Sequence, residues 1–308
     1  MNRADLLAVA LRAFAAEGID GGRLSGTAGD RLLDSYGAIT AEALAAVNAK
    51  STRMTVLGLC GAQGSGKSTT ARVVQDALRE LSGLSVATLS LDDLYLSRAA
   101  RGALARTVHP LLATRGVPGT HDVVRGLSVV DALDRAEAPA LTPLPRFDKA
   151  TDEPVDASTE PRFTGRPDLL IFEGWCVGAR AEEAAALLHP VNALERDEDP
   201  DGRWRGYVNE RLAGPYQELF GRIDCLVMLR APNFECVAGW RQEQEHKLLR
   251  RVRSMGNPEH ASRVLSDAEV TRFVMYFERV TRHVLADMPA YADLVIELNS
   301  AREVQSIR

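Results

Sequence analysis

The chain has 308 residues, of which 45% are hydrophobic and 26% are charged, so it can bury a large core as a globular protein. Its formal net charge of −5 gives no reason to expect a nucleic-acid partner, since phosphate backbones select basic faces. Because every apolar stretch is interrupted well before about 18 residues, we expect neither a membrane-spanning helix nor a membrane partner.

Residues 1–53 are predicted to form a helical N-terminal extension that precedes the main domain, residues 54–308. The first part is rich in alanine, and Asp5, Arg12 and Glu17 interrupt it too early for the apolar part of a signal peptide. An amphipathic helix accounts for this spacing better. Nothing in the composition indicates what the extension does.

Five short apolar runs are typical of buried parallel strands that are separated by helices and loops. They occupy residues 54–60, 85–91, 168–172, 225–229 and 293–298. This alternation predicts an α/β fold, a parallel sheet with helices on both faces. Helical spacing also predicts helices over residues 233–255 and 266–287.

Two polar segments interrupt this pattern. Residues 98–167 contain many prolines and glycines, so they form either a disordered segment or a functional elaboration of the domain. Residues 192–206 are predicted to form a polar loop that leads into a helix.

The four cysteines lie far apart and show no metal-binding spacing. Cys60 and Cys225 fall inside apolar runs, which favours small core residues in a reducing compartment, and we predict a cytoplasmic protein. The six histidines are equally scattered, so we expect no metal site built from protein ligands alone.

The stretch "GAQGSGKS", residues 61–68, directly follows the first predicted strand and opens a segment with helical periodicity. Glycines at 61, 64 and 66 allow a tight turn whose N–H groups face a phosphate, Lys67 would neutralise the β- and γ-phosphates, and Ser68 would offer its hydroxyl to Mg²⁺. This pattern predicts a P-loop NTPase-type sheet that binds a nucleoside triphosphate. The predicted nucleotide-binding residues are Gly61, Ala62, Gln63, Gly64, Ser65, Gly66, Lys67, Ser68 and Thr69.

Acidic residues follow the next two predicted strands. In an open parallel sheet, ligands bind beyond the carboxyl ends of the strands, so Gly61, Asp92 and Glu173 should converge on one rim. Glu173 is either a metal ligand together with Ser68 or a strand-end carboxylate in solvent. Asp92 and Asp93 are adjacent, and strand alternation would send only one of them toward the phosphates. The spacing alone does not choose between them.

At these residues the chain resembles the D-glycerate 3-kinase family, which is related to the P-loop kinases for uridine, ribulose phosphate and bacterial pantothenate. The matching stretches run in order from about residue 54 to the end: "GAQGSGKST", "LSLDDLYLS", "RGVPGTHD", "PRFDKA", "IFEGWCVG", "EDPDGRWRGYVNERL" and "WRQEQE". Leu94, Phe147 and Cys176–Val177 depart from the family pattern without removing a reacting group. The first 50 residues carry no family signal.

The resemblance implies transfer of the γ-phosphoryl of ATP to a hydroxyl of D-glycerate, with Mg²⁺ held by Ser68 and Glu173. Asp92 corresponds to the catalytic aspartate of these kinases, and Lys67 would stabilise charge on the phosphates. Arg241 lies where related kinases carry a lid. Its alternative role is an ion pair with Glu245 on a solvated helix face. The basic run 247–253 is interpreted mainly as solvated surface.

An acidic acceptor requires basic or hydrogen-bonding groups in its pocket. Within the family-like stretches, the predicted substrate-binding residues are Arg115, His121, Arg146 and Lys149. Each of them could alternatively be solvated loop surface.

Two other functions stay open from the sequence. One is a P-loop kinase for another small acceptor, such as a nucleoside, pantothenate or a sugar phosphate. The other is a nucleotide-dependent switch or ATPase. Against the second, the chain has no [NT]-K-x-D or LSGGQ-like stretch, and its third strand ends in Glu-Gly-Trp. The oligomeric state is not indicated.

Overall fold

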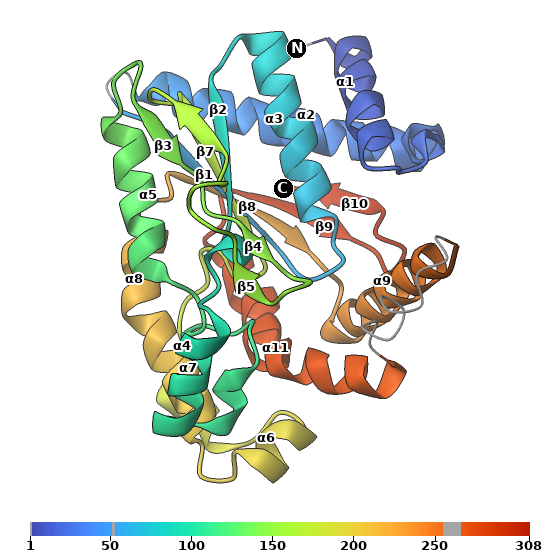
Figure 1. Cartoon of the computed structure of the whole chain (residues 1–308). Helices are drawn as coiled ribbons and strands as arrows, with labels where there is room; N and C mark the ends of the chain where they lie inside the picture. Colours follow the sequence, from blue (N-terminus) through green and yellow to red (C-terminus); the bar gives the residue numbers. More distant parts are fainter. Residues whose placement is uncertain (1, 51–52, 255–265) are drawn as a thin grey trace.

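A computed structural model describes residues 2–50, 53–254 and 266–308 of the chain (Figure 1). Its centre is a six-stranded sheet with the strand order β10-β9-β8-β1-β7-β2. The bounds of these strands are Thr55–Gly61 for β1, Val86–Ser90 for β2, Leu169–Gly174 for β7, Cys225–Arg230 for β8, Leu294–Leu298 for β9 and Val304–Ile307 for β10. All five predicted strands are confirmed, and they pair in parallel.

The sixth strand was not predicted. β10 pairs antiparallel with β9 at the edge of the sheet, and only Val304 among its residues is buried. A strand this short, with an otherwise exposed surface, has no apolar run by which the sequence would reveal it.

Helices cover both faces of the sheet (Figure 1). On one face lie α2 (Gly26–Ala49) and α3 (Lys67–Ser82), with α1 (Arg3–Ala16) packed on the outside of α3. On the other side, α5 packs against α8. The remaining helices are α4 (Arg98–Thr107), α5 (Val123–Arg135), α6 (Ala193–Glu198), α7 (Arg203–Ala213), α8 (Pro215–Phe220), α9 (Phe234–Ser254) and α11 (Asp267–Asp287). None of the helices in the described ranges is both long and apolar enough to cross a membrane.

The long insertion is an ordered elaboration of the domain. It contains α4 and α5 and two small antiparallel pairs, β3 (Leu141–Pro143) with β6 (Arg162–Thr164) and β4 (Phe147–Asp148) with β5 (Glu153–Pro154). The second pair is a hairpin that contacts the segment after β2. Of the two interpretations of this segment, the structure therefore supports the functional elaboration.

The predicted polar loop over 192–206 was wrong in part, because it contains α6 and the start of α7. Its charged residues are not all solvated: Glu195 and Asp199 are fully buried. Asn192 caps α6 by accepting a hydrogen bond from the Glu195 N–H, and Asp199 accepts hydrogen bonds from the N–H groups of Trp204 and Arg205. Capping and burial therefore organise a segment whose composition suggested a loop.

A buried ion pair holds α11 onto this region. The Arg279 guanidinium donates from Nε and Nη2 to the two carboxylate oxygens of Glu195, at 2.8 Å and 2.7 Å. It also donates to the carbonyl oxygens of Ala186 and His189. Because both side chains are almost wholly buried, neither charge has water as an alternative partner.

We expect Arg279→Leu to reduce the free energy of unfolding by about 3–5 kcal/mol, because it leaves the Glu195 carboxylate buried without a counter-charge. Urea unfolding at neutral pH measures the change. Arg272→Leu is the matched control on the same helix. It breaks a half-exposed pair with Glu198 and should cost no more than about 1 kcal/mol. Equal losses in the two variants would contradict a special role for the buried pair.

Candidate active site

The loop between β1 and α3 has the geometry of a phosphate cradle. Gly64 and Gly66 adopt φ values of +79° and +90°, a left-handed conformation that residues with a Cβ rarely adopt. A Cβ on Gly64 would lie 2.6 Å from Cβ of Trp240, so α9 also packs too closely for a larger residue. Lys67 is the first residue of α3, and the free N–H groups at this helix end are suited to bind an anion.

Glu173 lies beside this loop because β7 is the neighbour of β1. Ser68 donates its hydroxyl to Oε1 of Glu173 at 3.2 Å. Glu173 is 6% exposed, and its second carboxylate oxygen, Oε2, is buried without a hydrogen-bond partner among the described residues, as is Oγ of Ser65. A buried oxygen of this kind calls for water or a cation. A hydroxyl and a carboxylate fit the oxygen ligands that Mg²⁺ prefers.

Asp92 and Asp93 do not lie on a strand. β2 ends at Ser90, and both aspartates lie in a 3₁₀ turn over Leu91–Leu94. Strand alternation was therefore the wrong basis for separating them, although the side chains do diverge, because successive residues of a 3₁₀ turn point about 120° apart. Asp92 accepts hydrogen bonds from Lys149 at 2.6 Å and from the Tyr95 hydroxyl at 2.9 Å.

Asp93 binds the β4–β5 hairpin instead. Its Oδ1 accepts the N–H of Phe147 at 3.1 Å, and its Oδ2 lies 3.3 Å from Nη1 of Arg146. The two adjacent carboxylates thus hold two cations, Lys149 and Arg146, that the hairpin brings to the rim of the sheet. Both cations were predicted to bind substrate.

The two carboxyls differ in electrostatics. Burial opposes the ionisation of Asp92, but the charges of Lys149 and Lys67 and the hydrogen bonds from Lys149 and Tyr95 outweigh it and hold its pKa below the usual range. Burial raises the pKa of Asp93, with only partial compensation from Arg146 and the Phe147 N–H. Asp92 is therefore an ionised hydrogen-bond acceptor at neutral pH.

Arg115 is held by the tip of the same hairpin. It forms an ion pair with Asp152, which also accepts hydrogen bonds from the buried Arg101. The Arg115 guanidinium lies 5.6 Å from the centre of the Phe147 ring. Of the three predicted cations, Arg115 is thus the one whose carboxylate partner also pairs with a buried arginine.

His121 is buried and stacks on Tyr95, with 4.5 Å between the ring centres. Its Nδ1 lies 2.5 Å from the hydroxyl of Tyr216, which accepts a hydrogen bond from the Gly119 N–H. The tautomer of the ring decides whether Nδ1 donates to the Tyr216 hydroxyl or accepts from it. Burial lowers the pKa of His121 to about 3, and its buried Nε2 has no partner among the described residues. His121 is therefore a neutral ring with one unpartnered nitrogen, Nε2.

Arg241 lies on α9, and its guanidinium is 5.5 Å from the centre of the Phe273 ring of α11. The alternative ion pair with Glu245 and the basic run 247–253 concern side chains outside the part of the chain that the structure describes. From Phe273, ring contacts continue through Phe277 to Trp175, which donates its indole N–H to the carbonyl oxygen of Gly116.

Three aromatic residues in the site were not predicted: Tyr95, Trp175 and Tyr216. Tyr95 is three residues after Asp92, a spacing that places side chains together in a helical turn but not along a strand, so the expected strand hid this relation. Trp175 belongs to the family-like stretch after β7 and anchors the loop that carries His121. Tyr216 lies outside every quoted stretch, so no sequence signal pointed to it.

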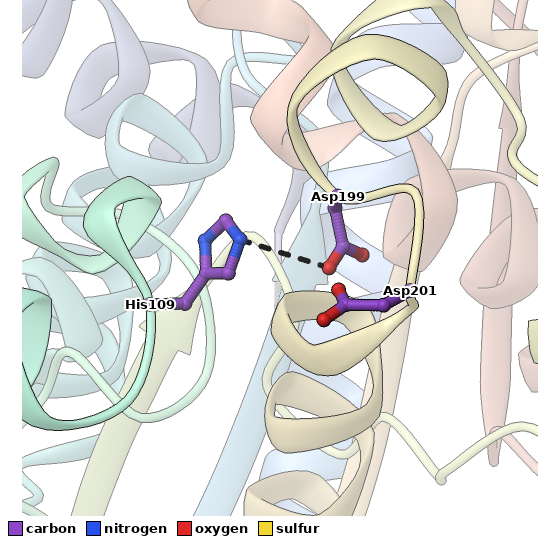
Figure 2. Close-up of side chains that lie close together, drawn as sticks. All are labelled: His109, Asp199 and Asp201. Carbon is purple, nitrogen blue, oxygen red and sulfur yellow. Dashed lines mark ion pairs between the residues drawn. The ribbon is translucent and has the colours of Figure 1, made fainter.

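One further cluster has the composition of a metal site but the bonding of a structural contact. His109 lies just before the 3₁₀ turn Pro110–Ala113, and Asp199 and Asp201 lie between α6 and α7, so the three side chains come together (Figure 2). Nδ1 of His109 accepts the Leu111 N–H, so the proton of the neutral ring is on Nε2, which faces Asp199 at 3.9 Å. Asp199 also pairs with Arg205 at 3.0 Å. The imidazole thus has no lone pair to offer a cation.

The neutral burial of His121 predicts a pH-dependent stability. Its pKa is about 3 in the folded protein against 6.5 ordinarily, so below about pH 6.5 only the unfolded chain binds this proton. Stability is therefore lost as pH falls from 6.5 toward 3. Between about pH 7 and pH 5.5 this group should cost about 1 kcal/mol, measured by urea unfolding. His121→Asn should remove that loss, whereas the exposed control His189→Asn should keep it. A His121→Asn variant with an unchanged pH dependence would contradict the assignment.

Comparisons with known proteins agree with this geometry. The chain is 34% identical over 238 residues to the uncharacterized kinase mug58 of Schizosaccharomyces pombe, covering 72% of this chain and 78% of that protein. It is 29% identical over 198 residues to the chloroplastic D-glycerate 3-kinase of Arabidopsis thaliana, covering 62% of this chain and 41% of the plant protein. No protein-family model matches the chain.

Among solved structures, D-glycerate 3-kinase from Cryptococcus neoformans has the same fold, with a TM-score of 0.69 and 24% identity over 89% of this chain and 98% of that one. The central sheet, the loop after β1 and the relation to mug58 lead to one conclusion. The chain belongs to the family of P-loop kinases that contains D-glycerate 3-kinase.

Proposed function

We propose that the chain is an ATP-dependent kinase that transfers the γ-phosphoryl group to a hydroxyl of D-glycerate. The observation that carries this proposal is the pairing of two cations of the β4–β5 hairpin with two carboxylates beside the phosphate loop. Arg146 and Lys149 are 38% and 57% exposed, so an incoming carboxylate can reach both. An anionic acceptor would take over these cations from Asp93 and Asp92. The two D-glycerate 3-kinases among the similar proteins support this choice of acid.

The nucleotide would bind through the N-terminus of α3 and Lys67. Ser68 and Glu173 would hold Mg²⁺, which neutralises charge on the phosphates when it is bound. Because phosphoryl transfer has a loose transition state, these residues contribute mainly by positioning and by stabilising charge. Arg241, on the helix that packs against Gly64, would complete the site from the lid side.

Asp92 would accept a hydrogen bond from the acceptor hydroxyl, orient its oxygen toward the γ-phosphorus and take up its proton late in the reaction. The bond from phosphorus to the ADP oxygen breaks as the bond to the glycerate oxygen forms. When Lys149 leaves Asp92 for the substrate carboxylate, the pKa of Asp92 rises, because its nearest counter-charge is lost. Substrate binding would thus make Asp92 a better base at the moment it is needed.

His121 and Tyr95 would form the floor of the acceptor pocket. The unpartnered Nε2 of His121 would contact a hydroxyl of the acceptor, a group that can both donate and accept a hydrogen bond. Tyr95 holds Asp92 and stacks on His121, so it connects the two groups.

Acceptor-dependent release of ADP from Mg-ATP tests this function. D-glycerate, L-glycerate, uridine, pantothenate and ribulose 5-phosphate are supplied separately, with a control that contains no acceptor. We expect selective turnover with D-glycerate. Turnover with one of the other acceptors would mean that D-glycerate is not the substrate. Slow ATP hydrolysis at the same rate with and without acceptors would mean that the protein is an ATPase and not a kinase.

Asp92→Asn should lower kcat at least about 100-fold while ATP binding stays near normal, because the acceptor hydroxyl loses its ionised partner. Asp93→Asn is the matched control. Its amide oxygen can still accept the Phe147 N–H, so kcat should change little, whereas the KM for the acidic acceptor should change through Arg146. Steady-state kinetics with both substrates separates the two outcomes. The opposite result, a large loss of kcat in Asp93→Asn alone, would transfer the catalytic role to Asp93.

A further inference from the structure

A cavity of about 200 Å³ lies beside the phosphate loop, on the side away from Asp92. Gly66 and Thr69 line it from the loop and α3, and Arg302 lines it from the segment between β9 and β10. Another part of the wall comes from the N-terminal extension and includes Ile19 and Tyr36. The helical extension, to which the sequence assigned no role, therefore reaches the predicted nucleotide site.

A hydrogen bond joins the extension to the loop directly. The Thr69 hydroxyl donates to Oε2 of Glu17, the residue that follows α1, at 2.7 Å. Behind this contact, Phe14 and Tyr36 are buried in one apolar cluster with Val73 of α3. The extension is thus packed on the helix that begins with Lys67, so its wall of the cavity has a defined position relative to the loop.

The order of the strands separates the two ends of the site. Asp92 follows β2 at one edge of the sheet, the phosphate loop follows β1 in the middle, and the cavity borders β8, β9 and β10 toward the other edge. A nucleotide whose γ-phosphate faces Asp92 must therefore direct its nucleoside toward the cavity.

The chemistry of the cavity fits that part of a nucleotide. Ile19, Phe14 and Leu298 offer apolar contact for a flat heterocycle, while Ser35, Gln244 and Arg302 offer polar contacts for its edge or for the ribose. Arg302 is positioned by an ion pair with Glu243 and lies 5.7 Å from the centre of the Trp240 ring. Pockets that enclose a whole small-molecule ligand have volumes of roughly 300–1,000 Å³. This cavity is smaller, so its size fits the nucleoside part of the nucleotide without the phosphates.

We propose that the N-terminal helices form one wall of the nucleotide site and that this cavity binds the nucleoside part of the triphosphate. The inference rests on the proposed function only in taking ATP as the phosphoryl donor. The N-terminal extension would then be part of the nucleotide-binding site, and Ile19 would contact the base and the ribose.

The experiment compares ATP with inorganic tripolyphosphate, which carries the phosphates without a nucleoside. Binding of each to the full-length protein is measured by titration calorimetry with Mg²⁺ and no acceptor. The wild-type protein should bind ATP at least about tenfold more tightly than tripolyphosphate. Ile19→Trp, which fills the cavity, should weaken ATP about tenfold and leave tripolyphosphate unchanged. Leu11→Trp, on the same part of the chain but outside the cavity lining, should change neither affinity.

Three results would overturn the proposal: equal wild-type affinities for the two ligands, unchanged ATP affinity in Ile19→Trp, or equal weakening of both ligands, which would indicate a distorted loop. Arg23→Trp, at an exposed residue of the cavity lining, gives a second test if Ile19→Trp does not fold. It should show the same selective loss of ATP affinity. Because no acceptor is present, failure of the glycerate assignment would leave these binding results unaffected.

Discussion

The position of β1 between β7 and β8 is the constraint on which the site depends. Every residue of β1 is buried, and its parallel register with β7 pairs Cys60 with Gly174. That register places the start of α3 beside Glu173. The N-terminus of α3, the Ser68 hydroxyl and the buried Glu173 carboxylate therefore lie together through strand pairing alone, and no long loop is needed to position them. A shift of the register would separate Ser68 from Glu173. Burial of apolar strands therefore sets the distance between the groups that we propose to bind metal and phosphate.

Three pairs of a carboxylate and a cation lie near the carboxyl ends of these strands. Asp92 with Lys149, Asp93 with Arg146 and Asp152 with Arg115 all join the sheet or its neighbouring loops to the β4–β5 hairpin. Under the proposed function, the first two cations would exchange their carboxylate partners for an anionic substrate. The third pair is also partly exposed, at 27% for Arg115 and 31% for Asp152, but Asp152 is shared with the buried Arg101. This second, buried cation distinguishes the structural pair from the other two.

The nucleotide side of the site is built from parts that are distant in sequence. Trp240 of α9 packs on Gly64, Arg302 lies over Trp240, and Glu17 bonds to Thr69. The N-terminal helices, α9 and the end of the sheet thus meet beside the phosphate loop. Because α1 and α2 also bury apolar side chains against α3, the extension is packed directly on the helix that follows the phosphate loop.

By itself, the sequence determined the parallel sheet, the phosphate loop and the rim on which the acidic residues lie. These follow from local signals: apolar runs of strand length, a glycine pattern that only a tight turn requires, and the rule that parallel strands place their carboxyl ends together. Tertiary structure alone decided the partners of Asp92 and Asp93, the burial of His121 against Tyr95 and Tyr216, and the contact of Glu17 with the loop. Each depends on groups tens to hundreds of residues apart, and the pairing of such groups is set by packing of the whole chain, which no local pattern encodes.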